Sequence, residues 1–60
     1  YYAGAEAALR YAQLLRREGR TDDARRTLRE LLDHAQQAPH HYRRAQAEWL
    51  SSAERELAGM

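Results

Sequence analysis

A chain of 60 residues has room for one small domain, and its ten basic residues, all arginine, are balanced by nine acidic residues to a net charge of +1. That balance argues against strong nonspecific binding to nucleic acid, which depends on accumulated positive charge. Because cysteine is absent, disulfides and thiolate metal sites are excluded. No apolar run approaches the ~20 residues that span a bilayer. We therefore expect a soluble protein without membrane insertion, with the cytoplasm as the favoured compartment.

The first predicted helix covers residues 3–18. Its apolar residues recur at helical spacing and form one stripe. That stripe comprises Ala5, Ala8, Ala12 and Leu15. Gly19 follows, and glycine readily takes the left-handed conformation that ends a helix. Tyr11 and Leu14 widen the stripe beyond what one neighbouring helix can cover, which favours a missing upstream segment or a second copy of the chain.

The second predicted helix covers residues 22–37. Thr21 is suited to cap its first turn, where Asp22 and Asp23 oppose the positive end of the helix dipole. Its apolar residues also recur at helical spacing. They are Ala24, Leu28, Leu31 and Leu32. The two helices on either side of Gly19 therefore predict a helical hairpin, in which alanines allow close approach and leucines fill the seam.

The third predicted helix covers residues 39–58, because proline suits a first helical turn and Gly59 can stop the last one. Its apolar residues fall within one arc, so this helix is one-sided. The arc contains Tyr42, Ala45, Trp49, Ala53 and Leu57. Residues 1–60 thus read as a single all-α domain of three antiparallel helices.

The spacing of these residues resembles the tetratricopeptide repeat, a helical hairpin with a period of about 34 residues. With Gly19 at the glycine between the paired helices, the packing positions of the family are met without a gap between about residues 5 and 49. In the first helix these positions hold Ala8, Tyr11, Ala12 and Leu15, and in the second Ala24, Leu28 and Leu31. The resemblance implies a fragment of a helical-repeat scaffold, and a generic three-helix bundle is the alternative.

One period further on, Tyr42 and Trp49 occupy positions of a following first helix. No glycine turn comes after Trp49, so we interpret residues 39–58 as a capping helix. The sequence departs from the family at three positions, where the aromatic residue, the glycine and the closing proline of the family pattern are replaced. The replacements are Ala8, Ala12 and Gln36. Because the chain begins with Tyr1 and not Met, we expect it to be the C-terminal part of a longer chain.

No arrangement of residues predicts catalysis. His34, His40 and His41 are possible metal ligands, but a site needs three or four ligands that converge. No nucleophile elbow presents Ser51 or Ser52, and the glycines are isolated, so no phosphate-binding loop is present. We expect no enzymatic activity, no cofactor and no bound metal.

The resemblance implies a noncatalytic module that binds a protein or peptide across the concave face formed by first helices. Arginine suits bidentate capture of carboxylates, so an acidic peptide is a fitting partner. The implied partner-binding residues are Leu9, Gln13, Arg16, Arg17 and Arg43. The alternative for these arginines is a solvated helix face paired with neighbouring acids.

Two other functions remain open. Self-association would bury Tyr11, Leu14 and Leu9 against a second copy of the chain, giving a homo-oligomer. A small Arg-rich nucleic-acid-binding domain would use the arginine doublets, and its binding must weaken steeply with salt. These doublets are Arg16–Arg17, Arg25–Arg26 and Arg43–Arg44.

Overall fold

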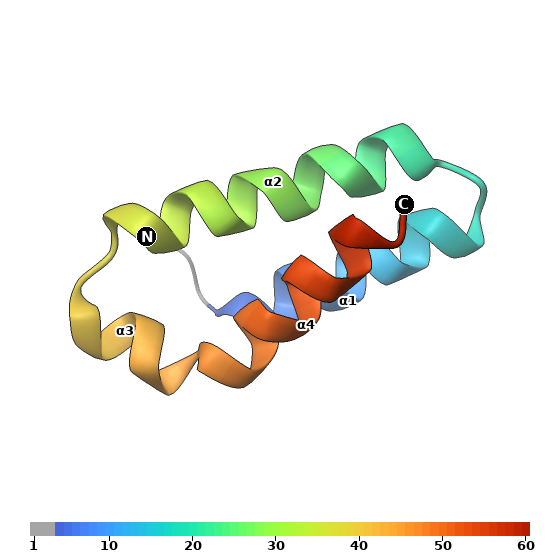
Figure 1. Ribbon diagram of the computed structural model, residues 1–60. Helices are drawn as coiled ribbons and strands as arrows, with labels where there is room; N and C mark the ends of the chain where they lie inside the picture. The colour runs from blue at the N-terminus through green and yellow to red at the C-terminus, as the bar shows by residue number, and fades with distance from the viewer. Residues whose placement is uncertain (1–3) are drawn as a thin grey trace.

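The structure, a computed structural model, describes residues 4–60, which form four helices joined by short turns. The helices are α1 (Ala5–Arg17), α2 (Thr21–Gln37), α3 (His40–Ala45) and α4 (Ala47–Ala58). Figure 1 shows α1 and α2 as an antiparallel pair, with α4 lying against them and α3 at the far end of α2. The all-α fold is therefore as predicted, while the expected start of the first helix at residue 3 lies outside the described residues. None of the helices in this part of the chain has the length and apolar character needed to cross a membrane.

The core lies where α1, α2 and α4 meet. Ala12 and Ala24 are almost completely buried in one cluster, so their small side chains let the helices approach closely. Leu28 and Leu31 are the largest fully buried side chains and fill the seam. The cluster consists of Ala5, Leu9, Ala12, Leu15, Ala24, Leu28, Leu31 and Ala53. Trp49 is partly buried and packs against this cluster, so the predicted hairpin and its closing helix share one core.

Gly19 forms the turn between α1 and α2 in the predicted way. Its φ is +83°, in the left-handed region that glycine adopts at least cost. The Gly19 N–H donates to the Arg16 carbonyl at 3.0 Å, and the Arg20 N–H donates to the Leu15 carbonyl at 2.8 Å. These two bonds form a Schellman motif, which satisfies carbonyl groups left without partners at the end of α1.

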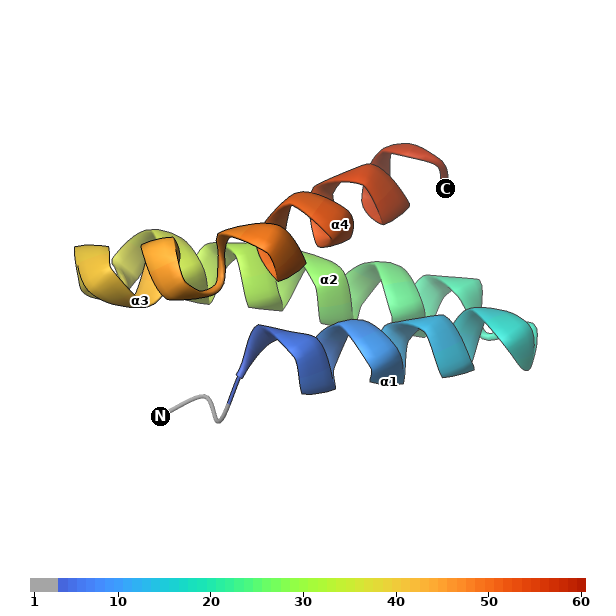
Figure 2. The ribbon, with the colours of Figure 1, turned by 90° about the horizontal axis from the view of Figure 1, so that it is seen from below.

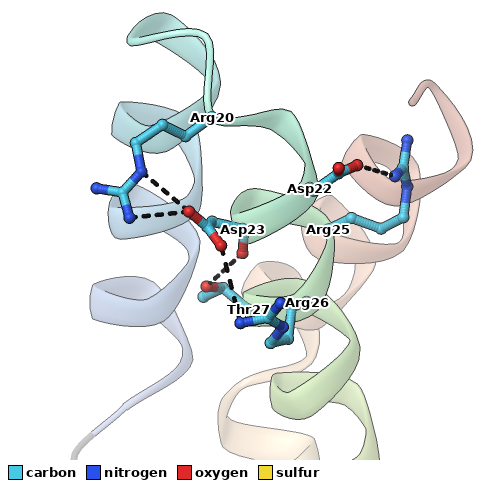
Figure 3. A network of polar contacts seen from close by, with 6 residues as sticks. All are labelled: Arg20, Asp22, Asp23, Arg25, Arg26 and Thr27. Carbon is cyan, nitrogen blue, oxygen red and sulfur yellow. Dashed lines mark hydrogen bonds and ion pairs between the residues drawn. The ribbon is translucent and has the colours of Figure 1, made fainter.

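The start of α2 differs from the prediction. Thr21 is the first helical residue, and Arg20 takes the capping position without a side-chain cap hydrogen bond. Asp23 is the centre of the local contacts: its carboxylate accepts from Arg20 Nε at 2.9 Å, and its backbone carbonyl accepts from Thr27 Oγ1 at 2.9 Å. Figure 3 shows this network at the first turns of α2. The prediction of Thr21 as the cap was therefore wrong, because Thr21 lies within the helix and the Arg20–Asp23 ion pair spans its first turn.

The predicted helix over residues 39–58 is divided at Gln46. The backbone there has φ −104° and ψ 11°, outside the regular helical range, and separates α3 from α4. The Oε1 atom of Gln46 accepts a hydrogen bond from the Ala5 N–H at 3.1 Å, so it supplies the cap that Gly4 cannot. This contact joins residues 41 positions apart. The prediction of one continuous helix failed because periodicity carries no information about such a distant contact.

Tyr11 is a third departure, since the family resemblance places it at a packing position. Its exposed fraction is 54%. The buried residues of α1 are Ala5, Leu9, Ala12 and Leu15. Tyr11 lies one residue, about 100° around the helix, before Ala12, and neither α2 nor α4 covers it. In the described part of the chain, Tyr11 therefore belongs to the outer surface of the hairpin.

Candidate binding groove between α1 and α4

Helices α1 and α4 run in the same direction and leave a groove between them. Gln46 at the start of α4 contacts Ala5 at the start of α1, and Glu56 near the end of α4 contacts Arg16 near the end of α1. The contacts thus advance together along both helices, and Figures 1 and 2 show that the helices run in the same direction, with α4 inclined to α1 in Figure 2. This arrangement places matching ends of the two helices side by side.

The walls of the groove follow from helical periodicity. Residues spaced three and four apart lie on one face of a helix, and each helix contributes one such stripe. On α1 the stripe is Leu9, Gln13 and Arg16, and on α4 it is Trp49, Ser52, Glu56 and Gly59, with Arg10 and Arg55 beside them. The cavity between the walls has a volume of about 400 Å³. Three arginines and one glutamate therefore line a groove that is positively charged on balance.

Glu56 links the two walls. Its Oε1 atom accepts from Arg16 Nη1 at 2.6 Å, and its Oε2 atom accepts from Gln13 Nε2 at 3.4 Å. The exposed fractions of the Arg16 and Glu56 side chains are 41% and 27%, so this ion pair is partly shielded from water. Both carboxylate oxygens of Glu56 are thus bound by side chains of α1.

Arg10 and Trp49 face each other across the groove. The Arg10 guanidinium carbon lies 6.0 Å from the centre of the Trp49 ring, at the limit of a cation–π contact. Arg10 Nε also donates to Glu6 Oε2 at 2.9 Å on the exposed side of α1. Trp49 therefore serves two purposes, since one part packs against the core and another lines the groove.

The structure separates the residues that the resemblance implied for partner binding. Gln13 and Arg16 line the groove, whereas Leu9 reaches its floor as a core residue with an exposed fraction of only 3%. Leu9 is accordingly unavailable to an outer self-interface. Arg17 and Arg43 are exposed but are absent from the groove lining.

Most of the second wall is missing from the sequence prediction. The repeat register assigns Arg43 to the concave face, but the break at Gln46 redirects the chain so that Trp49, Ser52 and Glu56 meet α1. The spacing of these three residues is helical and could have suggested a shared face. The helical spacing does not show that this face contacts α1, because that contact depends on the break at Gln46.

The arginine doublet on α2 is occupied locally. Arg25 Nη1 lies 2.9 Å from Asp22 Oδ1, and Arg26 Nη1 lies 3.8 Å from Asp23 Oδ1. Figure 3 shows both pairs on the first turns of α2. Arg25 and Arg26 thus form a helix face paired with neighbouring acids, outside the α1–α4 groove.

The histidines form no cluster. The His34 ring packs edge-on against Tyr42, with 6.3 Å between ring centres. Within residues 4–60, no group of three or more histidine, cysteine, aspartate or glutamate side chains is placed to hold a metal ion.

Paired antiparallel helices, followed by a further helix laid parallel to the first, are the arrangement of an all-α helical repeat. The sequence model of the tetratricopeptide repeat matches residues 5–49. The chain therefore belongs to the tetratricopeptide repeat family, whose members are noncatalytic scaffolds that typically bind proteins or peptides. No curated protein and no solved structure matches the chain.

Proposed function

We propose that this chain binds a short acidic peptide in the groove between α1 and α4. The observation that carries the proposal is the groove lining, which contains Arg10, Arg16 and Arg55 but only one glutamate. Arginine presents a planar fork of donors that matches a carboxylate. Trp49 adds an apolar surface beside these cations, and aromatic residues commonly anchor bound peptides.

Arg55 strengthens the electrostatic argument. Among residues 4–60 it forms no ion pair, although it lines the groove. A carboxylate that enters the groove therefore meets a cation that has no acidic partner within this part of the chain. Because the groove is half open to water, the attraction is moderate and is screened by salt.

The test compares two adjacent arginines. A fluorescein-labelled polyglutamate peptide is titrated with the wild type, Arg16→Gln and Arg17→Gln, and binding is followed by fluorescence anisotropy. The two variants remove the same charge, but only Arg16 lines the groove. We expect Arg16→Gln to weaken binding about tenfold, which corresponds to about 1.4 kcal/mol, while Arg17→Gln changes it little. Equal losses in both variants would assign the binding to net charge and refute the groove.

A second candidate function is self-association through the outer face of α1. Tyr11 and Leu14 are the exposed large hydrophobic residues of the described chain, with exposed fractions of 54% and 45%. If two copies of α1 pair in antiparallel fashion about Leu14, Tyr11 of one copy faces Arg17 of the other. In the same register Glu18 faces Arg10. These opposite charges and cation–π pairs suit a second copy of the chain.

Sedimentation equilibrium at several protein concentrations tests this candidate. We expect the wild type to dimerise with increasing concentration and Leu14→Glu to stay monomeric, because the substitution places two negative charges, one from each copy, opposite each other at the shared axis. Ser51→Glu is the matched control, since it adds the same charge at an exposed position of α4. A wild type that remains monomeric throughout would remove self-association from consideration.

A further inference from the structure

We infer that Glu56 acts as an internal competitor that occupies the peptide-binding groove and sets its affinity for acidic ligands. The inference rests on the proposed function, because it concerns the regulation of the same groove. Glu56 belongs to the chain itself, yet it makes the contacts that an incoming carboxylate would make. An acidic peptide must therefore displace Glu56 before it can use these donors.

The geometry of Glu56 is that of a bound carboxylate. Arg16 Nη1 donates to one oxygen at 2.6 Å and Gln13 Nε2 donates to the other at 3.4 Å. Charge-assisted bonds to a carboxylate are among the stronger hydrogen bonds in proteins. Both donors were implied as partner-binding residues by the family resemblance, and both are engaged by Glu56 in the structure.

The position of Glu56 is fixed by the packing of α4. Ala53, one turn earlier, is completely buried in the core, and Leu57 packs against the core on the next residue. Glu56 therefore reaches α1 from a helix that is already held in place. Because its carboxylate is tethered at the site, a free peptide competes against a high effective concentration.

The ion pair is nevertheless replaceable. The Arg16 and Glu56 side chains keep exposed fractions of 41% and 27%, so either can turn into water when a ligand arrives. Ion pairs with this degree of exposure contribute little stability. Glu56 is thus placed to lower the affinity of the groove and to discriminate against ligands with too little charge to displace it.

The experiment measures polyglutamate binding by fluorescence anisotropy for the wild type, Glu56→Gln and Glu54→Gln. Glutamine keeps the length of the side chain and still offers an oxygen to Arg16, and far-UV circular dichroism verifies that each variant remains helical. Glu54→Gln is the matched control, because it removes the same charge from an exposed position of the same helix. A polylysine peptide of equal length measures nonspecific binding.

We expect Glu56→Gln to bind polyglutamate about fivefold more tightly, the factor given by about 1 kcal/mol of ion-pair energy. Glu54→Gln should stay close to the wild type, and the gain should vanish when Arg16→Gln is added. Equal gains in both glutamine variants would mean that net charge alone matters, and a loss in Glu56→Gln would mean that Glu56 builds the site. Either result overturns the competitor role while the groove stands.

The two proposals fail in different ways. If the wild type binds polyglutamate and Glu56→Gln gains nothing, only the competitor role is refuted. If neither protein binds it, the acidic-peptide groove is refuted and the competitor role falls with it. If Glu56→Gln binds polyglutamate and the wild type does not, both proposals are supported, because Glu56 would then occupy the groove of the wild type completely.

Discussion

Leu28 is the residue whose truncation should damage the fold most. Its side chain is completely buried at the centre of α2, in the cluster shared by α1, α2 and α4. Replacing it with alanine removes most of this buried side chain and leaves a cavity among the three helices. We therefore expect Leu28→Ala to loosen both the hairpin and the docking of α4.

The expected loss is large in proportion to the whole stability. A fully buried Leu→Ala substitution costs about 2–5 kcal/mol, since it loses transfer free energy and leaves a cavity. A domain of 60 residues at about 0.05–0.15 kcal/mol per residue has a free energy of unfolding of about 3–9 kcal/mol. Leu28→Ala should thus unfold at a much lower urea concentration than the wild type, and it should be partly unfolded without denaturant if the wild type lies at the low end of this range.

Urea unfolding measured with two probes checks this prediction. Circular dichroism reports helix content, and the fluorescence of Trp49, the single tryptophan, reports the docking of α4. Leu14→Ala is the matched control, because the same substitution at an exposed fraction of 45% should change stability by no more than about 0.5 kcal/mol. Equal unfolding midpoints for Leu28→Ala and Leu14→Ala would refute the placement of the core.

Three further outcomes are expected. Gly19→Ala should destabilise the fold by about 1–2 kcal/mol, because the backbone φ at residue 19 is +83°. Gly59→Ala is the control and should not destabilise it, because φ there is −82°. Equal midpoints of the two variants in thermal unfolding would contradict this prediction. Gln46→Ala should cost about 0.5–2 kcal/mol because the Ala5 N–H loses its cap, and the exposed Gln36→Ala is its control. Polyglutamate binding should weaken steadily as salt is raised, and affinity independent of salt would argue against an arginine-lined site.

The sequence predicted the parts of the fold that depend on local rules. The apolar spacing placed Ala12, Ala24 and Leu28 in one seam, and Gly19 turned the chain at the expected residue. The same spacing carried the resemblance to the tetratricopeptide repeat, because the repeat of that family is one pair of packed helices joined by a turn.

The sequence predicted only the wall of the groove that α1 forms. Arg16 and Gln13 were implied by their place on the first helix, but their shared partner Glu56 lies 40 or more positions away. That contact exists because the chain bends at Gln46, and the bend accompanies a capping bond to Ala5 that no periodic pattern reports. The family register placed Tyr11 at a packing position because it does not say which faces remain uncovered in a given fragment, whereas the width of the apolar stripe put Tyr11 beyond the reach of one neighbouring helix, in agreement with its exposure.

The most direct test of the groove is a nuclear magnetic resonance titration of isotope-labelled protein with polyglutamate. We predict that the largest shifts occur at the Trp49 indole N–H and the Gln13 side-chain amide, both of which line the groove, while signals of Tyr11 and Leu14 on the outer face of α1 stay unchanged. Shifts confined to that outer face, or spread evenly over all the arginine-bearing surfaces, would contradict the account.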